Sequence, residues 1–119
     1  MEDSILKSIK KLLGIHEDDH SFDTDVIMHI NTVFMILTQL GVGPKEGFRI
    51  QDESTTWDEY ISEEIFLDSV KSYMYLKVKL IFDPPTISVV SNAMNESINE
   101  LESRINTFVE TELNNSKEV

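Results

Sequence analysis

One mostly apolar run, SVKSYMYLKVKLIFDPP at residues 69–85, constrains the fold more than any other stretch. The run makes up most of a long predicted helix, which covers residues 62–82. Apolar side chains fall on nearly every side of that helix. A helix of this kind is buried on most sides, by its own bundle and by a partner subunit. The paired prolines after Asp83 end it, because proline cannot continue the helical hydrogen-bond ladder. The run is not a membrane span, since it contains Lys71, Lys77 and Lys79.

Apolar residues that recur at intervals of three and four predict further helices at 4–13, 24–40 and 86–112, and a capping box at Thr56 and Glu59 predicts a short helix at 57–61. The apolar surface of the second is wider than one stripe, which predicts a helix in the centre of a bundle or at a subunit interface. The last helix has one narrow apolar seam and a polar remainder. The predicted caps are Asp3 or Ser4 with Gly14 for the first helix, Asp23 or Thr24 for the second, Thr56 with Glu59 for the third, and Thr86 or Ser88 for the last.

The segment between the second and third helices, GVGPKEGFRIQDESTT at 41–56, breaks the helical pattern with glycine and proline. Phe48 and Ile50 alternate with polar neighbours, which favours a short strand or an extended arm. This apolar pair either plugs the chain's own core or docks on a neighbouring chain. Trp57 has the same two interpretations, as an anchor at the edge of the core or as an anchor of an interface.

Together the segments predict an all-α fold, a small helical bundle of about four main helices with a long central loop that has room for a short strand or hairpin. The 119 residues form one domain, with residues 113–119 as a frayed tail. The chain has no cysteine, so it has no disulfide framework and no thiolate metal site. Its N-terminus lacks the pattern of a signal peptide, and a cytoplasmic protein is expected.

Acidic residues outnumber basic ones, and the formal net charge is −12. Residues 52–68 carry seven acids and no base, whereas bases gather at 71–79 and opposite the apolar face of the first helix, at Lys7, Lys10 and Lys11. A module that binds duplex DNA needs a basic footprint, so we expect no measurable duplex binding at physiological salt. Two interpretations of the acidic surface stay open: a solvated face that favours solubility, or a surface that DNA slides past without adhering.

The sequence HEDDH at residues 16–20 matches the H-E-x-x-H pattern of zinc hydrolases, in which two imidazoles share one face of a helix. Here Gly14 ends the preceding helix, and His29 is the only other histidine. A solvated acidic loop is therefore favoured over a metal site. The chain also lacks a Ser/His/Asp, Cys/His or glycine-rich phosphate constellation, so no catalytic residue, metal or cofactor is predicted and an enzyme is not expected.

Four blocks of sequence carry a resemblance to a known family: IKKLLGI at 9–15, HINTVFMILTQLGVGPKEGFRI at 29–50, TWDEYI at 56–61 and SYMYLKVKLIFDPP at 72–85. With the weaker block AMNESINELESRIN at 93–106 they span nearly the whole chain. The chain resembles the head–tail connector (head-completion adaptor) proteins of tailed bacteriophages and prophages. Each block is specific as a long string and much less so as a short motif.

The resemblance implies a structural virion protein in the neck, assembled in the cytoplasm of the host bacterium. About a dozen copies would form a ring beneath the portal protein, extend the DNA channel and dock the next neck or tail-completion protein after DNA packaging. DNA would pass through without specific binding, and neither a membrane nor a cofactor would take part. The alternative is a small acidic helical regulator encoded by a prophage, a monomer or dimer that binds another protein and not a portal.

Residues of the subunit or partner interface are predicted from large side chains in polar surroundings and from the seam of the last helix. The predicted set is Phe48, Ile50, Trp57, Tyr60, Tyr73, Tyr75, Leu101, Arg104, Ile105 and Phe108.

Overall fold

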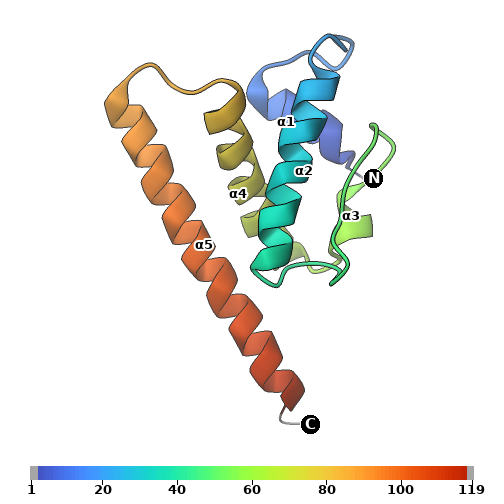
Figure 1. The fold of residues 1–119 in the computed structure, drawn as a ribbon, viewed down its shortest axis with the longest axis vertical. Helices are drawn as coiled ribbons and strands as arrows, with labels where there is room; N and C mark the ends of the chain where they lie inside the picture. Colours follow the sequence, from blue (N-terminus) through green and yellow to red (C-terminus); the bar gives the residue numbers. More distant parts are fainter. Residues whose placement is uncertain (1–2, 118–119) are drawn as a thin grey trace.

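The structure is a computed structural model, and it describes residues 3–117. In this part of the chain five helices and no strand form, which confirms the predicted all-α class (Figure 1). The helices are α1 (Ile5–Leu13), α2 (Asp23–Gln39), α3 (Trp57–Tyr60), α4 (Glu64–Phe82) and α5 (Ser88–Lys117).

Helix α4, which carries the apolar run, is the centre of the bundle. It packs against α2 on one side and α5 on the other, and α1 contacts both α2 and α4 (Figure 1). Val70, Tyr73, Met74 and Val78 of α4 are fully buried. None of the described helices is both long enough and apolar enough to cross a membrane.

Helix α1 begins and ends where the sequence predicts. The Ser4 hydroxyl accepts a hydrogen bond from the backbone N–H of Lys7 at 3.2 Å, which caps the first turn. Gly14 adopts φ 81° just after the last turn, a left-handed conformation that glycine reaches without strain. Ile5, Leu6 and Ile9 are buried against the other helices, so α1 is held by its apolar face.

The predicted N-cap of the second helix is wrong. Helix α2 already includes Asp23 and Thr24, and Phe22 occupies the N-cap position without a side-chain hydrogen bond. The Asp23 carboxylate is used elsewhere, because it forms an ion pair of 2.7 Å with the buried Lys10 ammonium. Phe22 packs edge-on against Phe82, with 5.6 Å between the ring centroids, and this contact joins the start of α2 to the end of α4.

The strand or hairpin predicted in the central loop does not form in the described residues. The Asn31 side chain of α2 instead pairs with both backbone groups of Ile50, accepting from its N–H at 2.8 Å and donating to its carbonyl at 3.0 Å. Near the loop's end an isolated antiparallel bridge joins Ser4 and Thr56. The third helix begins as predicted, because the Glu59 carboxylate accepts a hydrogen bond from the Thr56 N–H at 2.7 Å.

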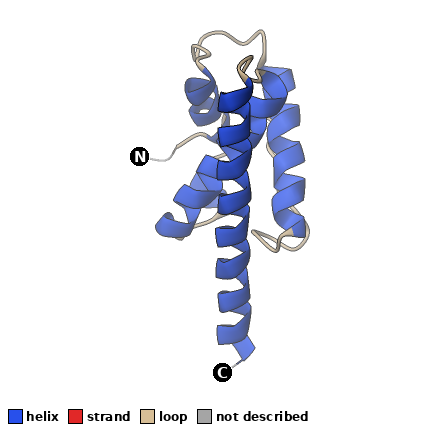
Figure 2. Cartoon of the chain, turned by 90° about the vertical axis from the view of Figure 1, so that its left-hand side faces the viewer, coloured by secondary structure: helices blue, strands red, loops and turns tan. Residues whose placement is uncertain are grey.

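The last helix is longer than predicted. Helix α5 continues to Lys117 where the apolar pattern placed its end at 112, and the rest of the predicted tail, 118–119, lies outside the described residues. Figure 2 shows α5, which ends near the C-terminus, running along most of the height of the molecule. Its buried residues, Ile98 and Ile105, sit in the middle of the helix, and the first turns are exposed.

A test of the loop packing is offered by Gly43, which has φ +79° and lies against Tyr60. An added Cβ would stand 2.6 Å from Tyr60 Cε1, whereas at Gly14, with φ +81°, nothing lies within 4 Å. Gly43→Ala and its control Gly14→Ala both place an alanine at a positive φ, which causes backbone strain of about 1–2 kcal/mol in each. We expect Gly43→Ala to lower the free energy of unfolding by roughly a further 1–3 kcal/mol, measured by urea denaturation. Equal losses in the two variants would contradict the close contact with Tyr60.

Candidate interaction surfaces

Four of the predicted interface residues come together around Phe34 of α2. The Phe48 ring lies 5.1 Å from Phe34 and the Tyr60 ring 4.7 Å from it, measured between centroids. Trp57 and Ile50 are buried beside them. Burial raises the pKa of the Tyr60 phenol, so this group stays neutral. In the single chain these side chains fill its own core, which was the other interpretation of the sequence, and their role at an interface stays a prediction.

The other predicted interface residues fall in three places: the seam between α4 and α5, the exposed surface of α5 and a recess beside α1. Tyr73 and Ile105 are buried between α4 and α5, and the Tyr73 hydroxyl donates to the Glu102 carboxylate at 3.0 Å. Burial, together with this carboxylate, raises the pKa of Tyr73 and keeps it a donor. The half-buried residues Leu101 and Phe108 continue the same seam. Arg104 is exposed, and its guanidinium pairs with the Glu100 carboxylate at 2.7 Å. Tyr75 lies apart from the others, in a recess beside α1.

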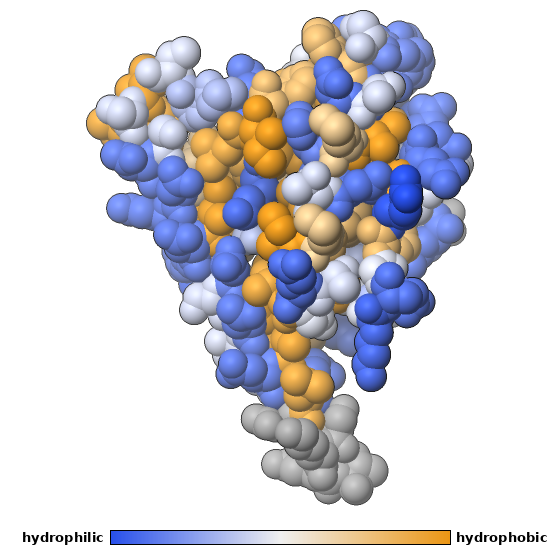
Figure 3. Space-filling model, in the orientation of Figure 1, coloured by the Kyte–Doolittle hydropathy of each residue, from blue (hydrophilic) through white to orange (hydrophobic). Residues whose placement is uncertain are grey.

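The structure exposes apolar residues that the sequence analysis did not assign to an interface. The most exposed are Ile65 on α4, at 88 %, and Val89 on α5, at 73 %. Figure 3 shows apolar surface along the boundary between α5 and the rest of the bundle. Two signals of this were present in the sequence: the apolar residues on nearly every side of the helix at 62–82, and the apolar surface of α2 beyond its main stripe, to which Met28 and Met35 belong. The exposed large apolar residues also include Leu12, Phe22, Ile81, Ile87, Val90 and Leu113.

An apolar pocket with an acidic rim opens where three segments meet: the loop after α2, the start of α4 and the last third of α5. Its volume is about 260 Å³. Phe66 of α4 and Phe108 of α5 stack in it, with ring centroids 4.0 Å apart and planes 11° from parallel. Leu113 stands at its edge, 56 % exposed. The rest of the lining is Gly41, Val42, Gly43, Ile61 and Val109, with the carboxylates of Glu63 and Glu112. We call this the acidic pocket.

A second surface combines apolar and basic residues on α1 and α4. Leu12, Tyr75 and Leu76 line a recess together with Lys71. Leu12 also borders a broader hollow along α1 that includes Lys7 and Lys11. We call the six residues Lys7, Lys11, Leu12, Lys71, Tyr75 and Leu76 the basic face.

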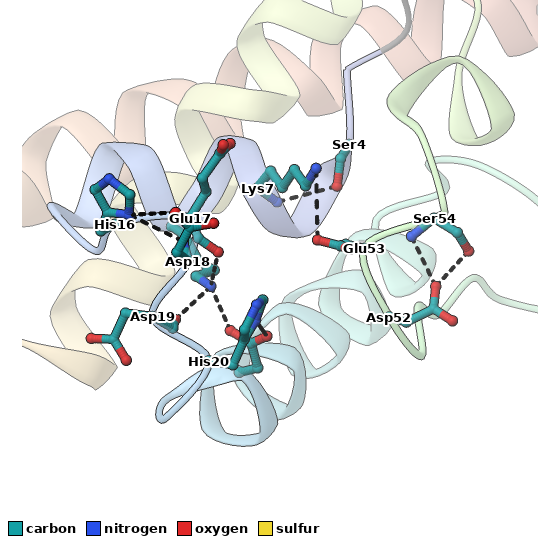
Figure 4. Close-up of polar contacts among 12 residues, drawn as sticks. Ser4, Lys7, His16, Glu17, Asp18, Asp19, His20, Asp52, Glu53 and Ser54 are labelled. Atoms are coloured by element: carbon teal, nitrogen blue, oxygen red, sulfur yellow. Dashed lines mark hydrogen bonds and ion pairs between the residues drawn. The ribbon is translucent and has the colours of Figure 1, made fainter.

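The two histidines of HEDDH do not share a helical face, because the segment is a loop (Figure 4). His16 Nδ1 accepts from the Asp18 N–H at 3.1 Å, while His20 Nδ1 lies 2.8 Å from the Asp23 carboxylate. Among the residues that the structure describes, no group of three or more histidine, aspartate or glutamate side chains is placed to hold a metal ion. The geometry is that of a solvated acidic loop.

Lys10 fastens this loop to the bundle. Its side chain is 1 % exposed, in contrast to the outward position predicted for it. The ammonium contacts the Asp23 carboxylate at 2.7 Å and donates to the carbonyls of Asp19 at 2.7 Å and Glu17 at 3.4 Å. Burial raises the pKa of Asp23, but hydrogen bonds from Lys10 and His20 outweigh this, so the pKa is lowered overall. The Asp23 carboxylate is therefore ionised and held in place.

Comparison with known protein families gives a match over most of the chain. A family model described as phage connector protein matches residues 5–112. No curated protein and no solved structure matches the chain significantly. The matched range contains α1 to α4 completely, and it extends through α5 as far as the acidic pocket.

Proposed function

Because the chain belongs to the phage connector protein family, we propose that it is the subunit of an adaptor ring beneath the portal of a tailed bacteriophage. The family is structural rather than catalytic, and its proteins connect parts of the phage particle. In our proposal about a dozen copies form the ring, as closed rings arise from repeated head-to-tail contacts. The ring extends the DNA channel in the neck of the virion and docks the next neck or tail-completion protein.

The family match carries the proposal, and the exposed apolar residues support it. Ile65, Val89, Met28 and Met35 lie on three different helices and are more than half exposed. Single exposed apolar residues are common, but contiguous apolar surface marks contact sites, and Figure 3 shows such surface along the boundary between α5 and the rest of the bundle. A ring subunit has such surfaces on several sides, because it meets two neighbours, the portal and the next neck protein.

The charge of the chain supports the role of a conduit. The net charge of −12 repels the phosphate backbone, so DNA moving through the ring is not retained by attraction. The bases are few, and several are engaged by nearby acids: Lys10 pairs with Asp23 and Lys79 with Asp83, each at 2.7 Å. No cofactor, metal or chemical step is part of the proposed function.

Co-assembly with the portal tests the proposal. The purified chain is mixed with the portal protein of the same phage and viewed by electron microscopy, with each protein alone as the control. We expect an added ring of density on one face of the portal, whether or not the free chain is a monomer. In parallel, duplex DNA titrated at physiological salt is expected to give no binding. A chain that never joins the portal, or that binds duplex DNA with a salt-sensitive micromolar affinity, would contradict the adaptor role.

A further inference from the structure

We propose that neighbouring subunits join head to tail through two different surfaces, the basic face of one copy docking on the acidic pocket of the next. Leu12 enters the apolar pocket, and Lys11 of the basic face meets the glutamates of its rim. This inference rests on the proposed ring and specifies its contact.

The acidic pocket has the form of a receptor for one large apolar side chain. Its floor is apolar and aromatic, built from Phe66 and Phe108, and its volume of about 260 Å³ exceeds that of a leucine side chain. Glu63 and Glu112 stand at the rim, and neither forms an ion pair within the described part of the chain. A complementary partner therefore brings an apolar side chain flanked by cations.

The basic face supplies that combination. Leu12 is 53 % exposed in the last turn of α1, although Ile5 and Ile9 on the same side of the helix are fully buried. Lys11 is exposed beside it and has no ion pair within residues 3–117. Lys7 and Lys71 have only long contacts, 3.7 Å to Glu53 and 3.5 Å to Asp3. Asp3 and Glu17 also line the hollow along α1, so Lys11 is the cation of this face that is available to the rim of the pocket.

The other exposed apolar residues fit the pocket less well. Ile65 follows Glu63 and Glu64, whose charge matches that of the rim and repels it. Val89 and its neighbours lie in a segment, 84–103, that contains no lysine or arginine, and Phe22, Met28 and Met35 lie in another such segment, 13–44. Ile81 has Lys79 nearby, but that ammonium is bonded to Asp83 at 2.7 Å. Charge complementarity therefore favours Leu12 of a second copy of this chain as the side chain that occupies the acidic pocket.

The pairing also explains why a ring is preferred to a dimer. The two surfaces are different, so each copy uses one and leaves the other free, and repetition of the contact builds a ring when the rotation between copies closes, as we propose for copies assembled on the portal. Two acidic pockets placed face to face would bring four glutamates together, and two basic faces would bring lysines together. Like charges across an interface disfavour both symmetric dimers.

A charge swap tests the contact in the full-length chain assembled on the portal. We expect Lys11→Glu and Glu112→Lys each to weaken assembly about fivefold or more, through like-charge repulsion, and the double variant to restore it. Arg49→Glu, at an exposed loop residue outside both surfaces, is the matched control and is expected to change little. All substituted side chains are exposed, and urea unfolding checks that the fold is kept.

A crosslink gives a second readout that does not depend on affinity. The chain has no cysteine, so the double variant Leu12→Cys/Leu113→Cys has no background. Under mild oxidation of the assembled ring we expect a ladder of multimers on a denaturing gel, and neither single variant gives one. A ring that forms without the ladder and tolerates both charge reversals overturns this contact but leaves the adaptor function standing. Failure of the wild-type chain to join the portal overturns both.

Discussion

Replacing Trp57 with alanine is expected to lower the free energy of unfolding by about 3–5 kcal/mol, the range for a large aromatic side chain removed from a core. Trp57 is 2 % exposed and packs beside Phe34, with ring centroids 6.3 Å apart. Its indole N–H donates to the Ser8 hydroxyl at 2.8 Å, which ties α3 to α1. Urea unfolding of the free chain, followed by circular dichroism, measures the loss.

Two milder variants separate the contribution of the buried ring from that of its hydrogen bond. Trp57→Phe keeps most of the apolar volume and removes the N–H donor. Ser8→Ala removes the acceptor of that N–H, together with the hydrogen bond of 2.9 Å that the Ser8 hydroxyl donates to the Ile5 carbonyl, and we expect a loss of about 1 kcal/mol. The same series tests the predicted interface role of Trp57. If Trp57→Ala leaves the free energy of unfolding of the free chain unchanged but abolishes ring assembly, this tryptophan acts at an interface and not in the core.

The second large effect is expected at Lys10. Lys10→Met removes a buried cation, leaves the Asp23 carboxylate with His20 alone and leaves the Asp19 carbonyl without its donor, for which we expect a loss of about 2–3 kcal/mol of stability. The neighbouring Lys11→Met removes the same charge from an exposed position and is expected to stay within about 0.5 kcal/mol of wild type. Urea denaturation at neutral pH compares the two. Similar small losses in both variants would contradict the buried ion pair.

The same pair predicts a dependence on pH. The pKa of Asp23 is lower in the folded chain than in the unfolded one, because hydrogen bonds from Lys10 and His20 outweigh the effect of burial. The stabilisation from its carboxylate is therefore complete above the unfolded pKa and is lost as the pH falls through the folded value. Stability measured over this acidic range is expected to fall more steeply in wild type than in Lys10→Met.

Local patterns in the sequence were sufficient to predict several of the helix ends. The paired prolines mark the end of α4, Ser4 and Gly14 bound α1, and the capping box begins α3, because each of these signals acts within one turn of its own residue. The N-cap of α2 was missed for a non-local reason. Lys10 lies on the polar side of α1 in the sequence pattern, and only the fold shows that the loop after α1 closes over it and recruits Asp23.

The loop and the interaction surfaces were harder to predict, because they depend on contacts between distant residues. The alternation around Phe48 and Ile50 resembles a strand, but Asn31, on α2, takes both hydrogen-bonding groups of Ile50. Aromatic residues in polar surroundings suggested an interface, yet in the fold Trp57 and Tyr60 turn inward onto Phe34. Conversely, nothing adjacent to Leu12 in the sequence indicates that a neighbouring helix leaves it half uncovered.

Helix α5 is packed unevenly against the bundle, and this affects the local stability of its first turns. The middle of the helix is anchored by Ile98 and Ile105, whereas the turns around Val89 have few neighbours of their own. Local opening costs little free energy where a helix has few buried contacts. Any partner that covers these turns would therefore slow their hydrogen exchange as it binds, and the order of this end of the subunit would follow the concentration of its partner.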